Sequence, residues 1–249
     1  MSITGGTLYV KSWTPVSVRR EEPVILLHDS IGCVGLWRDF PALLADRTDR
    51  KVIAYDRLGF GKSTPRTDAP STNFIAEEAH VLRALMAQLE IPNAALFGYS
   101  VGGSMALCAA ASDPGAYIAV ISESAQAFVE DQTLRGIEAA RERFADPEQR
   151  AKLVRWHGER TDWILKSWMD VWSDPNYAGW SLRDVLPQVR CPLLAIHGDR
   201  DEFGTFAFPR MIADLAGGES EMLLLEDCGH IPHREKADEV LTAVERLLR

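Results

Sequence analysis

A serine stands between two glycines in the stretch Gly98-Tyr99-Ser100-Val101-Gly102, in a chain of 249 residues. An apolar run at 94–97 precedes it, and a segment of helical composition follows. A strand that turns abruptly into a helix exposes one side chain at the carboxyl edge of a sheet, and glycines two residues away on each side leave room for the close packing. The pattern predicts that Ser100 is a nucleophile at a helix N-terminus, where backbone N–H groups favour negative charge. An ordinary N-cap serine in a tight turn is the simpler alternative.

A serine hydroxyl is a weak nucleophile unless a neighbouring base takes its proton. His230 and His233 lie in a glycine-bearing loop after the last predicted strand. That loop opens at the same sheet edge as Ser100 if the strands are parallel. We therefore expect His230 to be the base, with His233 as its competitor.

The base in turn needs a carboxylate to orient it. Asp199 and Asp201 both follow the predicted strand at 192–196 and open at that edge. Glu123, which follows the preceding strand, is a weaker alternative. The residues alone leave the choice between Asp199 and Asp201 open.

Acyl transfer also requires N–H donors for a developing oxyanion. The amide of Val101, at the start of the helix, is one candidate. The second is expected from the loop at 28–32, where Ser30 is the best-placed donor. A metal site built from Cys228, His230 and His233 is not expected, because no further ligand has suitable spacing.

The segments that must position these side chains alternate between strand and helix patterns. Strands are predicted at 7–13, 24–27, 51–55, 94–97, 117–121, 192–196 and 221–225, and helices at 36–45, 72–89, 101–111, 206–215 and 237–248. The continuous apolar runs are typical of strands buried on both faces. This alternation predicts parallel βαβ units in an α/β doubly wound sheet.

Residues 124–188 interrupt this pattern and contain no convincing strand. They hold five of the seven tryptophans of the chain. We interpret them as a helical cap inserted into a core formed by 1–123 and 189–249. Trp163 and Trp168 are the candidate substrate-binding residues of this cap, although helix-to-helix packing would also explain tryptophans here.

Together these motifs resemble the α/β-hydrolase superfamily. The similar stretches are LLHDSIG at 26–32, YDRLGFGKS at 55–63, GYSVGG at 98–103, HGDRD at 197–201 and GHIPHREKADEV at 229–240. The resemblance implies a mostly parallel, eight-stranded sheet with helices on both faces, a helical cap and no cofactor. It also favours Asp201 over Asp199 and His230 over His233 in a serine–histidine–aspartate triad.

The chain departs from the family pattern at Asp29, where the family usually has glycine after the loop histidine. A carboxylate aimed into the site would oppose an oxyanion. We expect the Asp29 side chain to point away from the site, toward an arginine such as Arg57.

Composition limits the possible partners. The formal net charge is −9 without a basic run, so nucleic acid and anionic membranes are poor partners. No apolar run approaches the length of a membrane span, no signal-peptide pattern opens the chain, and the four cysteines are far apart. We expect a cytoplasmic protein whose partner is a small-molecule substrate; the oligomeric state is not predicted.

These observations predict a serine hydrolase that cleaves a small, apolar ester through an acyl-enzyme. Two alternatives stay open. One is a hydrolase of carbon–carbon bonds in vinylogous diketones, which the resemblance also allows. The other is an inert, ligand-binding member of the same fold.

Overall fold

The computed structural model describes all 249 residues. Its strands are β1 (Ser2–Ile3), β2 (Gly6–Thr7), β3 (Val10–Trp13), β4 (Val24–Leu27), β5 (Val52–Tyr55), β6 (Ala94–Tyr99), β7 (Tyr117–Glu123), β8 (Leu193–Gly198) and β9 (Ser220–Leu225). Its α-helices are α1 (Phe40–Thr48), α2 (Phe74–Gln88), α3 (Val101–Ser112), α4 (Asp131–Ala145), α5 (Pro147–His157), α6 (Thr161–Ser173), α7 (Ala207–Leu215), α8 (Pro232–Glu235) and α9 (Ala237–Leu247). Four short 3₁₀ helices are η1 (Val34–Trp37), η2 (Gly158–Arg160), η3 (Pro175–Tyr177) and η4 (Leu186–Gln188).

Most predicted elements are confirmed, but the first helix begins later than expected. The sequence predicts it at 36–45, whereas α1 begins at Phe40 and is preceded by η1. Pro41 explains the shift. A proline lacks a backbone N–H and its ring clashes with the carbonyl four residues earlier, so it fits only in the first turn of a helix.

The main sheet has seven strands in the order β3-β5-β4-β6-β7-β8-β9, not the eight that the resemblance implies. Only β3 runs antiparallel to its neighbour. The residues before β3 pair with each other, since β1 and β2 form a separate two-stranded sheet. Gly5 and Gly6 have positive φ and turn the chain after β1. A longer regular strand would not accommodate these backbone angles.

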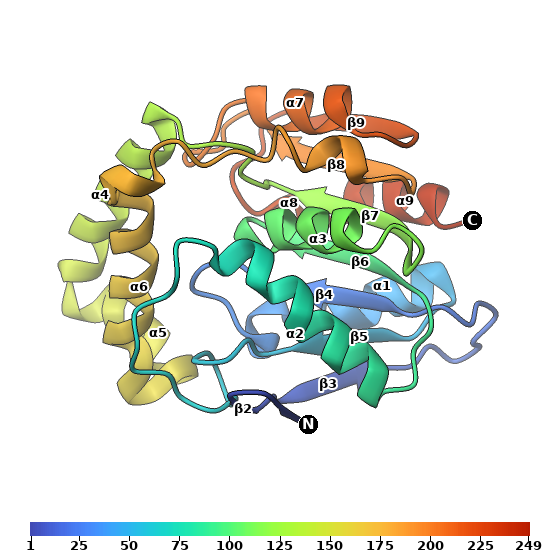
Figure 1. Cartoon of the computed structure of the whole chain (residues 1–249), viewed down its shortest axis with the longest axis horizontal. Coiled ribbons are helices and arrows are strands. Elements are labelled where there is room, and N and C mark those ends of the chain that lie inside the picture. The colour runs from blue at the N-terminus through green and yellow to red at the C-terminus, as the bar shows by residue number, and fades with distance from the viewer.

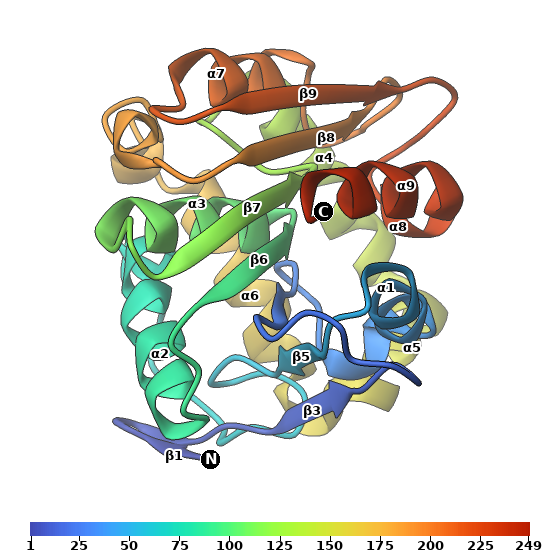
Figure 2. The same cartoon turned by 90° about the vertical axis from the view of Figure 1, so that its right-hand side faces the viewer.

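Helices cover both faces of the sheet (Figure 2). On one face α2, α3 and α7 pack on side chains such as Ile25 and Leu27. On the other face α1 and α9 pack on Val24 and Leu26. Successive residues of β4 thus contribute to opposite cores, which explains why this strand is a continuous apolar run.

The chain between β7 and β8 forms α4, α5 and α6, which stand together at one end of the sheet (Figure 1). Its only β-structure is an isolated bridge between Phe128 and Ser181. No helix of the structure combines the length and the apolar character needed to cross a lipid bilayer.

Candidate active site

Ser100 connects β6 to α3 through a sharp turn in which its own φ and ψ are 55° and −127°. This is an unfavourable conformation for a residue with a side chain, and the glycines on each side make the turn possible. A Cβ on Gly98 would lie 2.1 Å from the carbonyl oxygen of Gly102, and one on Gly102 would lie 2.1 Å from that of Leu27. The Ser100 N–H donates to the Glu123 carbonyl at 2.8 Å, which ties the turn to the end of β7.

Three side chains from separate loops form one hydrogen-bonded line. The Ser100 Oγ lies 3.0 Å from Nε2 of His230. Nδ1 of His230 lies 2.9 and 2.8 Å from the two carboxylate oxygens of Asp201. The three residues follow β6, β9 and β8, whose carboxyl ends meet at one edge because these strands are parallel. In such a line the imidazole can take the hydroxyl proton while the carboxylate stabilises the imidazolium.

Burial and charge act in opposite directions on the imidazole and the carboxylate. Burial favours neutral His230, but the charge and hydrogen bond of Asp201 outweigh burial and raise the pKa of His230 above its ordinary value. Burial would raise the pKa of Asp201, yet the neighbouring His230 lowers it below the usual range. The pair therefore favours an ionised carboxylate beside an imidazole that readily accepts a proton.

The competing candidates have other partners. Asp199 accepts a hydrogen bond from the Cys228 N–H at 3.2 Å. Nδ1 of His233 lies 2.5 Å from Oε1 of Glu123, in a buried pair. No hydrogen bond joins Asp199 to His230 or His233 to the Ser100 hydroxyl, so the geometry favours Asp201 and His230.

The two amides expected to hold an oxyanion belong to Val101 and Ser30. Val101 is the first residue of α3, and the first-turn amides of a helix lack intrahelical partners. The Ser30 N–H donates to no other group of the protein. Ser30 and Ser100 line the same cavity. Both amides are thus free to donate to a bound ligand.

Asp29 contacts Arg57 through its backbone. Nη2 of Arg57 donates to the backbone carbonyl of Asp29 at 2.8 Å. Asp29 is also one of the residues that line the cavity containing Ser100 and His230. Its negative charge acts on both groups, because it helps to raise the pKa of His230 and opposes the lowering of the pKa of Arg57 by burial. The orientation of the Asp29 carboxylate away from the site therefore stays a prediction.

The cavity at Ser100 and His230 has a volume of about 680 Å³ and is roofed by the helices between β7 and β8. Trp168 lies on its wall, with a ring centroid 5.9 Å from that of Phe203. Trp163 does not line this cavity. It packs instead against Phe60, at a centroid distance of 5.8 Å.

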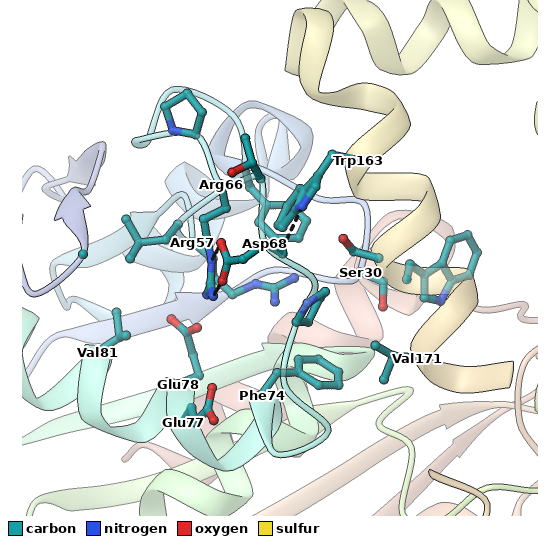
Figure 3. Close-up of a pocket in the computed structure, with 18 of the residues that line it drawn as sticks. Ser30, Arg57, Arg66, Asp68, Phe74, Glu77, Glu78, Val81, Trp163 and Val171 are labelled. Carbon is teal, nitrogen blue, oxygen red and sulfur yellow. Dashed lines mark hydrogen bonds and ion pairs between the residues drawn. The ribbon is translucent and has the colours of Figure 1, made fainter. Parts of the chain in front are cut away.

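A second cavity of about 460 Å³ adjoins the first, and Ser30, Trp168 and Trp172 line both. Trp163 belongs to this second cavity, where its Nε1 donates to the Asp68 carbonyl at 3.0 Å. Figure 3 shows Glu77 and Glu78 of α2 on the wall that faces Arg57 and Arg66. Charged groups of both signs thus line the second cavity.

Two residues beside Ser100 and His230 are absent from the sequence-based predictions. Nε2 of Gln126 donates to Ser100 Oγ at 3.4 Å, and the ring of Phe203 lies 4.8 Å from that of His230. Gln126 follows β7 at the carboxyl edge of the sheet, and this position is the signal that could have identified it. Phe203 comes two residues after Asp201, but nothing in its residue type distinguishes it from a core phenylalanine.

Comparison with known sequences identifies related enzymes. The profile of the alpha/beta hydrolase family matches residues 24–243. The serine hydrolase BPHL of Mus musculus is 30% identical over 240 residues, which cover 92% of this chain and 80% of that protein. The esterase YbfF of Escherichia coli is 27% identical over 262 residues, which cover 97% of this chain and 98% of that protein.

Comparison with solved structures gives the same fold. The enol-lactonase of Burkholderia xenovorans superposes with a TM-score of 0.77 at 21% identity, covering 99% of this chain and 98% of that one. At this identity the likeness concerns the fold alone.

Proposed function

This chain belongs to the alpha/beta hydrolase family, and we propose that it is a serine esterase that forms an acyl-enzyme on Ser100. The observation that carries the proposal is the unbroken line of hydrogen bonds from Asp201 through His230 to the Ser100 hydroxyl. The hydroxyl end of that line faces a cavity large enough for a small molecule. The relatives named serine hydrolase and esterase support the choice of a hydrolase that uses serine.

In the acylation step, Ser100 Oγ attacks the ester carbonyl carbon while Nε2 of His230 takes the hydroxyl proton. Asp201 holds the ring in the orientation that presents Nε2 and stabilises the imidazolium. The carbonyl oxygen becomes an oxyanion, which the N–H groups of Val101 and Ser30 bind. The carbon–oxygen bond to the alcohol then breaks, and the departing alkoxide receives the proton from His230.

In the deacylation step, water enters beside His230 and loses a proton to Nε2 as it attacks the acyl carbon. The same two amides bind the second oxyanion. When the intermediate collapses, the bond to Ser100 breaks and the proton returns to Oγ. The products are the carboxylic acid and the free enzyme.

Residues 124–188 act in this proposal as a lid, and 1–123 with 189–249 as the catalytic core. Trp168 and Phe203 supply apolar surface beside the reacting carbonyl, which suits an apolar acyl or alcohol group. Gln126 keeps an amide N–H within reach of the Ser100 hydroxyl. Trp163 contacts only a substrate portion that extends into the second cavity.

Substitution of the nucleophile tests the proposal. Ser100→Ala should abolish turnover of nitrophenyl esters and labelling by a fluorophosphonate, while circular dichroism remains that of the folded protein. Ser112→Ala is the matched control, because its hydroxyl lies on the same helix and bonds only the Ala109 carbonyl. Ester turnover that survives in Ser100→Ala would refute the role of Ser100.

A vinylogous diketone tests the alternative that the same triad hydrolyses a carbon–carbon bond. If the diketone is turned over faster than any ester, the protein is a carbon–carbon bond hydrolase and not an esterase. If neither substrate class reacts and no label attaches, the protein is an inert member of its fold.

A further inference from the structure

Five basic side chains line the cavity that contains Ser100 and His230. They are Arg38, Arg143, Lys152, Arg155 and Arg234. Only two carboxylates, Asp29 and Glu202, line the same cavity. The whole chain has a formal charge of −9. The cavity is therefore positive although the molecule is negative.

None of these five cations has a carboxylate partner within 4.0 Å, whereas ten arginines elsewhere in the chain form ion pairs. Lys152 bonds the neutral side chain of Gln149 at 2.8 Å, and Arg234 donates to the Leu36 carbonyl. Their charges are thus not neutralised by the protein. All five side chains are exposed to solvent, and all five line the same cavity.

The cations come from two opposite parts of the structure. Arg143, Lys152 and Arg155 belong to α4 and α5, whereas Arg38 and Arg234 belong to η1 and α8 regions of the core. The two parts touch where the Trp156 ring packs on Gly35, so closely that a Cβ there would lie 2.3 Å from the ring. This contact holds the cations of α5 near those of the core.

Arg38 occupies a conformation that residues with a side chain rarely adopt, with φ 54° and ψ −121°. Such a conformation costs free energy and persists only where the surrounding structure enforces it. Here it places a guanidinium on the cavity wall. Arg38 therefore combines a strained backbone with a charge that has no carboxylate partner.

We propose that the substrate carries an anionic group, a carboxylate or a phosphate, which binds these cations while its ester carbonyl lies at Ser100; this assignment rests on the proposed esterase function. Guanidinium groups match the geometry of both anions and can bind them through two parallel hydrogen bonds. One exposed ion pair contributes little in water. Several cations around one cavity act together, because its walls concentrate their field on the bound anion.

The test compares two nitrophenyl esters of equal acyl length, the neutral pentanoate and the glutarate monoester with its free carboxylate. We expect the wild-type enzyme to have a kcat/KM for the glutarate ester about 10-fold above that for the pentanoate. The ratio should fall toward one in Arg143→Gln/Arg155→Gln. It should also fall as salt rises, because salt screens exposed charges.

Arg135→Gln/Arg141→Gln is the matched control. It removes the same charge from α4 at positions that do not line the cavity, and its ratio should equal that of the wild type. A third ester with a terminal phosphate shows which anion the cations prefer. A wild-type ratio of one or less, or an equal ratio in both double variants, would overturn the assignment.

Binding measurements separate this inference from the esterase proposal. The glutarate ester should bind Ser100→Ala more tightly than the pentanoate does in calorimetry, and the difference should vanish when Arg143→Gln and Arg155→Gln are added. Ser100-dependent hydrolysis of both esters without a preference refutes only the anion site. Preferential binding of the glutarate ester by a protein that hydrolyses no ester refutes only the esterase.

Discussion

His230 is buried against aromatic rings, yet its imidazole must become positively charged during the reaction. Its ring lies 5.3 Å from that of Tyr99 and 4.8 Å from that of Phe203, and such surroundings disfavour an imidazolium. The Asp201 carboxylate reverses that preference. A base that is neutral before the reaction and charged during it needs both influences, because either alone would fix one protonation state.

The pH dependence of activity should report this balance. Protonated His230 cannot accept the Ser100 proton, so kcat/KM should decrease as the pH falls through the His230 pKa. Because that pKa is raised above 6.5, the midpoint of the acid limb should lie above pH 6.5. The measurement is kcat/KM for a neutral ester from about pH 5 to about pH 9.

Asp201→Asn provides the comparison for this profile. The substitution removes the attraction and leaves the burial, so the acid midpoint should move to lower pH while kcat falls about 10⁴-fold. A midpoint that stays in place would show that another group titrates. Asp199→Asn should leave the midpoint near its wild-type value, because Asp199 bonds a backbone amide and not the imidazole.

The second histidine–carboxylate pair has a different environment. His233 lies among the rings of Trp37, Phe40 and Tyr99, and its Glu123 partner accepts the Ser100 N–H through its backbone carbonyl. The pair therefore stabilises the backbone turn at Ser100. His233, three residues after the base, thus has a structural role.

At the scale of the elements, the β6–α3 connection determines where the hydroxyl stands. Residues of α3 from Val101 to Ala110 are all buried, since the helix packs on the sheet and is covered by α2. Small residues allow this close approach, and the glycines at its start allow the closest contacts. The position of Ser100 is therefore a consequence of helix packing.

Gly102→Ala should destabilise the protein, because the added Cβ would lie 2.1 Å from the Leu27 carbonyl oxygen. Two backbone segments would have to separate, at a cost of about 3 kcal/mol in the free energy of unfolding. Urea denaturation followed by circular dichroism measures the change. Gly115→Ala is the control and should be nearly neutral, because nothing lies within 4 Å of its added Cβ. Equal stability of the two variants would contradict the close packing described for the turn.

At the scale of the whole molecule, one buried arginine joins segments far apart in the chain. Nη1 of Arg50 donates to the Glu22 carbonyl and carboxylate at 2.8 and 2.9 Å, and Nη2 donates to the Leu248 carbonyl at 3.2 Å. Arg50 precedes β5, whereas Leu248 follows the last helix. The guanidinium thus fastens the C-terminal helix to the loop before β4.

Arg50→Met should lower the free energy of unfolding by about 2 kcal/mol, since it leaves buried carbonyl groups without donors. Partial exposure of Glu22 keeps the expected loss moderate. Thermal denaturation measures it. Arg19→Met, which removes an exposed ion pair with Asp49, should change the melting temperature little. A loss of equal size in both variants would mean that overall charge, and not the buried contacts, is responsible.

The sequence alone determined the α/β class, nearly all strands of the sheet and the turn that presents Ser100. These features are local. An apolar run buried on both faces, or a glycine on each side of a serine, has the same meaning wherever the chain places it. The histidine and acid loops were also predictable, because each directly follows a strand of a parallel sheet.

Only the tertiary structure decided which side chains from those loops meet. It paired His230 with Asp201 and His233 with Glu123, and it placed Trp168 but not Trp163 on the wall of the cavity at Ser100. It also gathered five unpaired cations around one cavity from segments more than a hundred residues apart. Contacts of this kind depend on how α4, α5 and α6 pack over the edge of the sheet, and no local pattern specifies that packing.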